Sequence, residues 1–162
     1  MRDPPILSGS EVVYLDRVET AAPLRFYLHP GSRVPVHCSA SGKMSLAQMG
    51  QAQRRRLLAN ASLEAYTAST LTDAAALEAE IQRVRKNGFA IDNEEFLPGL
   101  LCIAALVPAT GESPSNLCIA VQAPVMRLDI AKAKTLLPAL QRAALALSRI
   151  DADATPARRA QA

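Results

Sequence analysis

The stretch FAIDNEEFLPGLLCIAALVP, residues 89–108, contains two strand-like runs joined by an acidic turn. The first run ends at Asp92, and Glu94 and Glu95 fall in the turn that follows. The second run is almost wholly apolar and carries Cys102 near its start, as expected of a buried strand. A carboxylate at the end of one strand and a thiol near the start of the buried strand that follows are compatible with a catalytic site, a metal site or a small-molecule pocket.

The flanking segments read as helices and further strands. The sequence TDAAALEAEIQRVRKNG predicts a helix that is capped at Thr72 or Asp73 and stopped by Gly88, with one apolar stripe. Two shorter helices are expected between Ser39 and Asn60, the first of them capped at Ser39 or Ser41, and a long helix is expected to begin at Asp129. The strands are expected in EVVYLDRVE (11–19), PLRFYL (23–28), at the end of HPGSRVPVH (29–37), and in LCIAVQAP (117–124).

The order of strands, helices, strands and a final helix predicts an α+β fold with an antiparallel sheet. A chain of 162 residues suits a single core. We expect a ragged N-terminal segment over residues 1–10, one domain over 11–150 and a disordered tail over 151–162.

Composition narrows the class of protein. No apolar run reaches the roughly 18 to 20 residues of a membrane helix, and residues 1–10 lack the apolar part of a signal peptide, so a cytoplasmic location is expected. The net charge is only +3, and the triplet Arg54–Arg56 is expected to be a solvated helix face, so no nucleic-acid surface is predicted. Three cysteines without a close pair argue against disulfides and a structural zinc site.

The segment PVHCSASGK, residues 35–43, runs from an extended piece into a helix N-terminus. Free backbone N–H groups around Ala40 and Ser41 would favour a carboxylate or phosphate there. The same residues also fit a plain capped helix start. His37 and Cys38 are neighbours whose side chains should point apart, which disfavours a catalytic pair. A metal site formed by His37, Asp92 and Cys102 is chemically allowed, but the residues are dispersed, and we expect no metal and no cofactor.

Several motifs occur in one order along the chain: GSRVPVHCSASGK (31–43), AYTASTLTDAAALEAEIQRVRKNGFAIDNEE (65–95), GLLCIAALV (99–107) and ALALS (144–148). Together they resemble the effector-binding domain of the IclR family of bacterial transcriptional regulators, over about residues 11–150. The resemblance implies a GAF-like domain in which a curved antiparallel sheet is flanked by helices. It also implies a small organic or aromatic acid as effector, a homodimer or homotetramer, and DNA binding only through a winged helix-turn-helix domain that this chain does not contain.

The resemblance also implies a pocket. Ala40 and Ser41 would hold the carboxylate of the effector through their N–H groups, and Asp92 and Cys102 would be polar pocket residues. The implied apolar wall consists of Pro23, Phe26, Met44 and Leu100. No catalytic residue is expected.

One departure concerns the last strand. Relatives that bind very small keto acids have a sequence similar to SxSGP on the last strand. In this chain the two serines are replaced by Ala120 and Gln122, within AVQAP. This difference argues against glyoxylate or pyruvate and favours a larger acid, with Gln122 as a hydrogen-bonding partner. Two alternatives stay open: a GAF-like cysteine redox enzyme, and an oligomerisation scaffold without ligand.

Overall fold

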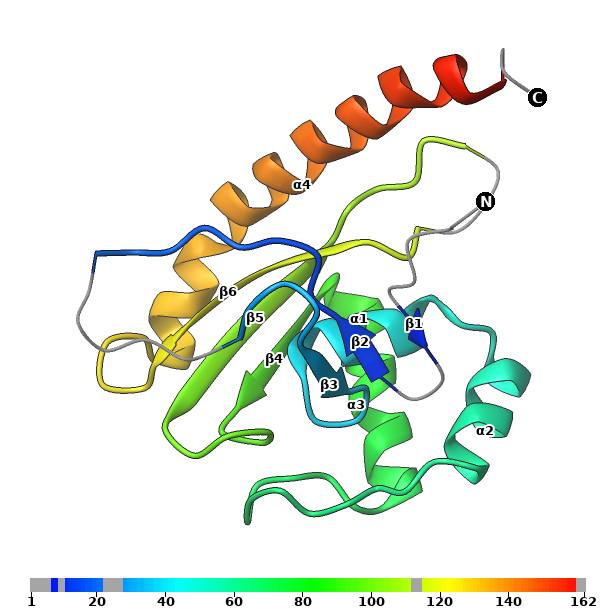
Figure 1. The fold of residues 1–162 in the computed structure, drawn as a ribbon. Helices are drawn as coiled ribbons and strands as arrows, with labels where there is room; N and C mark the ends of the chain where they lie inside the picture. The colour runs from blue at the N-terminus through cyan, green and yellow to red at the C-terminus, as the bar shows by residue number, and fades with distance from the viewer. Residues whose placement is uncertain (1–6, 9–10, 22–27, 112–114, 160–162) are drawn as a thin grey trace.

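The computed structural model describes residues 7–8, 11–21, 28–111 and 115–159. The secondary structure runs along the chain as β1 (Leu7–Ser8), β2 (Glu11–Val13), β3 (Arg33–Pro35), α1 (Ala40–Gln48), α2 (Gln51–Ala59), α3 (Ala74–Asn87), β4 (Phe89–Asn93), β5 (Leu100–Leu106), β6 (Cys118–Pro124) and α4 (Ile130–Arg159) (Figure 1). The predicted α+β class with antiparallel pairing is confirmed.

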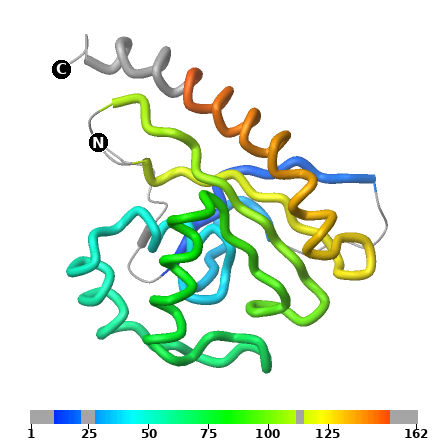
Figure 2. Tube along the Cα trace, turned by 180° about the vertical axis from the view of Figure 1, so that it is seen from behind, coloured from blue at the N-terminus to red at the C-terminus, as the bar shows by residue number. Residues whose placement is uncertain are grey.

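The central sheet has the order β4-β5-β6, and each pair of strands is antiparallel. The middle strand β5 is buried on both faces because helices cover both of them (Figure 2). Cys102 and Ala104 face a core that is shared with α1 and α3, whereas Leu101 and Ile103 face a core that is shared with α4.

A second, smaller sheet with the order β1-β2-β3 lies beside α1 (Figure 1). Strand β2 is shorter than predicted, because the chain after Val13 pairs only at Tyr14, which exchanges backbone hydrogen bonds with Gly31 and Ser32. Beyond it, Leu15 and Val18 are exposed. The strand predicted over 23–28 falls almost entirely outside the described residues.

The start of α1 lies directly on the backbone of residues 35 and 36. The Ser39 hydroxyl donates to the Pro35 carbonyl over 2.7 Å and accepts from the Gly42 N–H over 3.1 Å, so Ser39 is the N-cap that the sequence predicts. A Cβ atom on Gly42 would lie 2.4 Å from the Cα of Val36, which is closer than real atoms approach. The absence of a side chain at Gly42 therefore sets the position of the first turn of α1.

Helix α3 has the predicted caps. Asp73 accepts from the Ala76 N–H over 2.8 Å, and Gly88 adopts the left-handed conformation with φ 77°. The prediction for Arg54 is wrong. Its side chain is 0% exposed, donates to both carboxylate oxygens of Glu78 on α3, and also donates to the carbonyl of Met49 at the end of α1. Arg54 thus ties α2 to the two neighbouring helices, whereas Arg55 and Arg56 are exposed as expected.

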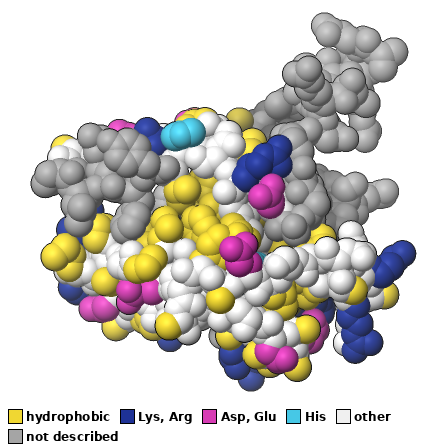
Figure 3. All heavy atoms as spheres, turned by 60° about the horizontal axis from the view of Figure 1, so that its bottom comes forward, with side chains coloured by type: hydrophobic (Ala, Val, Ile, Leu, Met, Phe, Trp, Pro, Cys, Tyr) yellow, Lys and Arg dark blue, Asp and Glu magenta, His cyan; other side chains and the backbone are white. Residues whose placement is uncertain are grey.

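Helix α4 covers the other face of the central sheet with Ala133, Leu140 and Ala144. It continues to Arg159, through most of the segment for which a disordered tail is expected. Within the part of the chain that the structure describes, no helix is long and apolar enough to cross a membrane. Acidic and basic side chains are scattered around the margin of the face in Figure 3, with apolar side chains between them.

Candidate functional site

Three polar residues form one row across the central sheet. Asp92 on β4 is paired with Cys102 on β5, and Cys102 is paired with Gln122 on β6. Directly opposite residues of antiparallel strands project from the same face, so the three side chains lie on the face of Cys102, toward α1. The fold therefore brings together three residues that are 10 and 20 positions apart in the sequence.

Asp92 is held in place by the turn that follows it. Its side chain is only 2% exposed, and its Oδ1 atom accepts from the N–H of Glu95 over 2.8 Å and from the N–H of Phe96 over 3.3 Å. Burial raises the pKa of Asp92 from 3.8 to about 6, and the negative charge of Glu95 adds to this rise. Asp92 is thus a fixed carboxyl group whose protonation changes at mildly acidic pH.

The middle of the row is neutral. Burial, together with the nearby charge of Asp92, raises the pKa of Cys102 far above neutral pH. Tyr14 has its pKa raised by burial and by its proximity to Cys102 and Asp92, so its hydroxyl stays protonated beside them. The sequence analysis missed Tyr14, because an aromatic residue at the end of a short strand gives no signal of its partners.

The first turn of α1 faces the same core. Ser39 caps the N–H of Gly42, whereas the N–H groups of Ala40 and Ser41 belong to the first turn and have no acceptor within the helix. The carbonyl of Ser41 lies 3.9 Å from the sulfur of Cys118, which places the start of β6 beside this turn. Ala40 is buried in the same cluster as Cys102.

The other predicted pocket residues have different positions. Met44 is buried in the cluster with Ala40 and Cys102, and Ala120 packs against that cluster. Leu100 is buried at the start of β5, opposite Pro124, and is not part of the cluster. Pro23 and Phe26 lie outside the described residues. No cluster of three or more His, Cys, Asp or Glu side chains among the described residues is placed to hold a metal ion.

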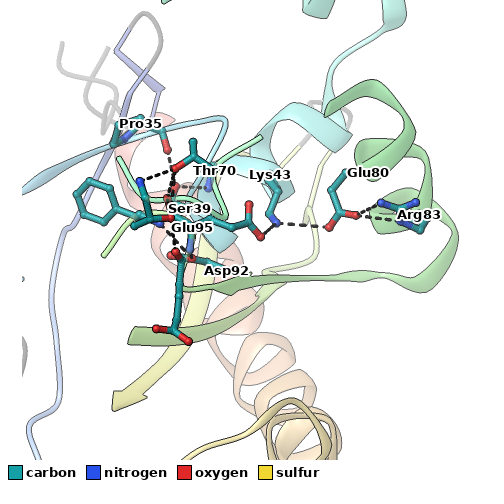
Figure 4. Close-up of polar contacts among 12 residues, drawn as sticks. Pro35, Ser39, Lys43, Thr70, Glu80, Arg83, Asp92 and Glu95 are labelled. Atoms are coloured by element: carbon teal, nitrogen blue, oxygen red, sulfur yellow. Dashed lines mark hydrogen bonds and ion pairs between the residues drawn. The ribbon is translucent and has the colours of Figure 1, made fainter. Parts of the chain in front are cut away.

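A buried ion pair joins α1 to the turn that holds Asp92 (Figure 4). Lys43 on α1 is 0% exposed, and its Nζ atom lies 2.7 Å from a carboxylate oxygen of Glu95 and 3.4 Å from one of Glu80. Arg83 pairs with Glu80 at the outer end of this chain of charges. The sequence analysis missed Lys43, because its partners are 37 and 52 positions away.

Two threonines fix the turn between β4 and β5. The hydroxyl of Thr67 donates to the carbonyl of Glu94, and the hydroxyl of Thr70 donates to the carbonyl of Glu95, both over 2.6 Å. The carboxylate of Glu94 accepts from the N–H of Gly99 over 2.8 Å, so Glu94 shapes the turn as expected. The turn that holds Asp92 is therefore itself hydrogen-bonded to the loop before α3.

Asp92 is expected to make the stability of the protein depend on pH. The pKa of Asp92 is 3.8 in the unfolded chain and about 6 in the folded one. Between these pH values the folded state therefore holds a proton on Asp92 that the unfolded state has lost. The contribution of Asp92 to stability is therefore largest below this window and falls, by at most about 3 kcal/mol, as pH rises through it.

The variant Asp92→Asn isolates this effect, because the amide oxygen can still accept from the Glu95 N–H and does not titrate. The free energy of unfolding of Asp92→Asn, measured by urea titration relative to wild type, should increase between about pH 4 and pH 7. All other acids are common to both proteins. A constant difference across this range would show that Asp92 is not buried as described.

The thiols are expected to react slowly in the native protein. Burial raises the pKa of Cys38 to about 12 and that of Cys118 to about 12, and Cys102 is shifted in the same direction. Because the thiolate is the reactive form, Ellman's reagent should label all three only after unfolding by guanidinium chloride. Rapid labelling of one thiol in the native protein would support the alternative of a cysteine redox enzyme.

Comparisons with known proteins show the family of the chain. The family model described as "Bacterial transcriptional regulator IclR C-terminal" matches residues 5–149. The chain is 46% identical over 139 residues to the probable transcriptional regulator SauR of Cupriavidus necator, covering 86% of this chain and 55% of the relative. It is 38% identical over 144 residues to the HTH-type transcriptional regulator BhcR of Paracoccus denitrificans, covering 88% and 51%.

Solved structures show the same fold. The crystal structure of IclR from Thermotoga maritima superposes with a TM-score of 0.80 at 26% identity, over 88% of this chain and 57% of that one. The repressor BlcR of Agobacterium tumefaciens superposes with a TM-score of 0.77 at 29% identity, over 88% and 56%. The chain thus spans about half the length of the curated relatives it matches. It belongs to the IclR family of bacterial transcriptional regulators and corresponds to the C-terminal, effector-binding domain of that family.

Proposed function

We propose that this chain senses a small organic or aromatic carboxylate for a DNA-binding regulator of transcription. The observation that carries the proposal is the polar row of Asp92, Cys102 and Gln122, which faces α1 beside an apolar cluster; Asp92 and Cys102 are buried, and Gln122 is half-buried with a buried Oε1 atom. A few polar groups that converge inside an apolar shell are typical of small-molecule sites.

In the proposed complex, the carboxylate of the effector accepts hydrogen bonds from the N–H groups of Ala40 and Ser41, where the positive end of the helix dipole favours an anion. Asp92, Cys102 and Gln122 select the remainder of the molecule. Ala120, which has a small side chain, lies two residues before Gln122 on β6, and Met44 contributes to the apolar wall.

The proposed readout involves parts beyond this chain. DNA would be bound by a winged helix-turn-helix domain, as the names of the HTH-type relatives suggest, in a homodimer or homotetramer in the cytoplasm. The effector can shift that assembly only if it binds one arrangement more tightly than another. Asp92 is hydrogen-bonded to the N–H of Glu95, and the carboxylate of Glu95 pairs with Lys43 on α1. Through these contacts, a ligand bound at Asp92 would affect the position of α1.

The two alternatives are weaker. A redox enzyme needs an accessible thiol of low pKa, whereas burial raises the pKa of all three cysteines. A ligand-free scaffold gives no reason for a buried carboxyl group and a buried amide oxygen beside one apolar cluster, since each costs stability.

A thermal-shift screen tests the proposal. The chain is heated with keto acids, hydroxybenzoates and dicarboxylates, beside the variants Asp92→Ala and Gln122→Ser and the control Asp16→Ala, which removes an exposed carboxylate. An acid at 100 times its dissociation constant should stabilise the wild type and Asp16→Ala by about 2.7 kcal/mol, which raises the midpoint by several degrees. Asp92→Ala should lose this shift. If no acid shifts the wild type, the proposal is wrong.

A further inference from the structure

Gln122 presents a buried acceptor that is not used. Among the side chains of the described residues, its Oε1 atom is one of two buried oxygens without a hydrogen-bond partner, the other being Oε2 of Glu95. A buried oxygen without a donor destabilises the folded chain. Glu95 has Lys43 on its other carboxylate oxygen, whereas no hydrogen bond to Oε1 of the Gln122 side chain is found among the described residues. A donor is therefore expected to reach Gln122 from a bound molecule.

The surroundings of Gln122 restrict that donor. Its neighbour in the row, Cys102, is a protonated thiol and a weak hydrogen-bonding group. Beyond Cys102 stands Asp92, which receives both of its backbone hydrogen bonds on Oδ1. Neighbouring strands are about 4.8 Å apart, so the Cα atoms of Asp92 and Gln122, on either side of Cys102, are about 10 Å apart.

The two sides of this core have opposite hydrogen-bonding character. The first turn of α1 offers the N–H groups of Ala40 and Ser41, which are donors suited to an anion. The row on the sheet offers acceptors, namely Oε1 of Gln122 and the carboxylate of Asp92. A ligand that satisfies both sides needs an anionic group at one end and a hydrogen-bond donor at the other.

The burial of the row favours a neutral donor over a cationic one. Asp92 is 2% exposed and Cys102 is 3% exposed, and Cys102 belongs to an apolar cluster. An ammonium group above Cys102 would have to lose its hydration shell there. A hydroxyl group can donate without that penalty.

We infer that the effector is a hydroxy acid, whose hydroxyl group donates to Oε1 of Gln122 while its carboxylate lies at the start of α1. This inference rests on the proposed function and makes Gln122 the residue that selects the class of acid. A site that is built around a hydrogen bond to a hydroxyl group rejects the analogue without it, because the acceptor is then left unpaired.

Matched pairs of probes test the inference by isothermal titration calorimetry. The pairs are glycolate and acetate, 4-hydroxybutyrate and butyrate, and 4-hydroxybenzoate and benzoate, and succinate serves as an acid whose far end only accepts. In the wild type, at least one hydroxy acid should bind about ten- to a hundredfold more tightly than its partner. In Gln122→Met, which keeps the length of the side chain but lacks the acceptor, the two members of that pair should bind about equally.

The thermal midpoint of unliganded Gln122→Met should equal or exceed that of the wild type, which shows that the variant is folded. If acids bind but the hydroxyl group adds nothing, the inference fails and the proposed function stands. If succinate binds most tightly and Gln122→Met loses it, the amide N–H is the group in use and the inference is wrong. If no acid binds the wild type, both fail.

Discussion

The variant Gly42→Ala is expected to unfold more easily than the wild type by at least about 3 kcal/mol. In an exposed helix the same change would stabilise, by up to about 1 kcal/mol, because alanine is the better helix former. Here the new Cβ atom would lie 2.4 Å from the Cα of Val36 and 2.5 Å from its carbonyl oxygen. Both are backbone atoms, so the clash is relieved only by moving α1 away from Val36, which disturbs the packing of the helix.

Gly50→Ala is the matched control. Gly50 is the residue before α2, has a negative φ of −61°, and a Cβ atom built on it meets no atom within 4 Å. Because Gly50 is the N-cap of α2, where alanine is less favourable than glycine, its replacement should lower the free energy of unfolding by about 1 kcal/mol or less. Urea titration of the two variants beside the wild type measures the difference. Equal effects of the two substitutions would contradict the close contact between α1 and residue 36.

The position of Gly42 also matters for the proposed site. The N–H groups of Ala40 and Ser41 lie in the same turn, and Ser39 fixes that turn to the Pro35 carbonyl. A displacement of α1 would therefore move the proposed carboxylate site together with the helix. Partial rescue of Gly42→Ala by an acid that binds the wild type would connect the packing of this turn to binding.

Much of the fold could be predicted because the signals are local. Ser39, Asp73 and Gly88 act on hydrogen bonds within one helical turn, and each has the predicted role. Arg54 was placed on a solvated face because its real partner, Glu78, is 24 positions away and only the packing of α2 against α3 brings the two together. Length and charge pattern carry no information about such a contact.

The candidate site, too, could be predicted only in part from the sequence. Asp92 and Cys102 stand out in the sequence, but the register that makes them neighbours is a property of the assembled sheet. Their roles were therefore taken from a family resemblance, not from spacing. Tyr14 and Lys43 were missed because both come from segments far from the acidic turn, and each resembles an ordinary strand or helix residue until the chain is folded.

The variant Lys43→Met is expected to destabilise the protein by about 3–5 kcal/mol. Methionine replaces the buried length of the side chain, but it leaves the carboxylate of Glu95 in the core without its cation at 2.7 Å. Glu95 already has its pKa raised by burial, and Lys43 is the main group that opposes this shift. Without Lys43, Glu95 must take up a proton or leave the core, and either change disturbs the turn that holds Asp92.

Two further variants separate this cause from a general loss of packing. Arg83→Met breaks the ion pair with Glu80 at the exposed end of the same chain of charges and should cost less than about 1 kcal/mol. The double variant Lys43→Met, Glu95→Leu removes both buried charges and should recover most of the stability lost in the single variant. If the double variant is as unstable as Lys43→Met alone, the loss comes from packing around residue 43 and not from an unpaired carboxylate. Recovery of stability without recovery of acid binding would assign the ion pair to the placement of Asp92, which is the role that the geometry of the turn supports.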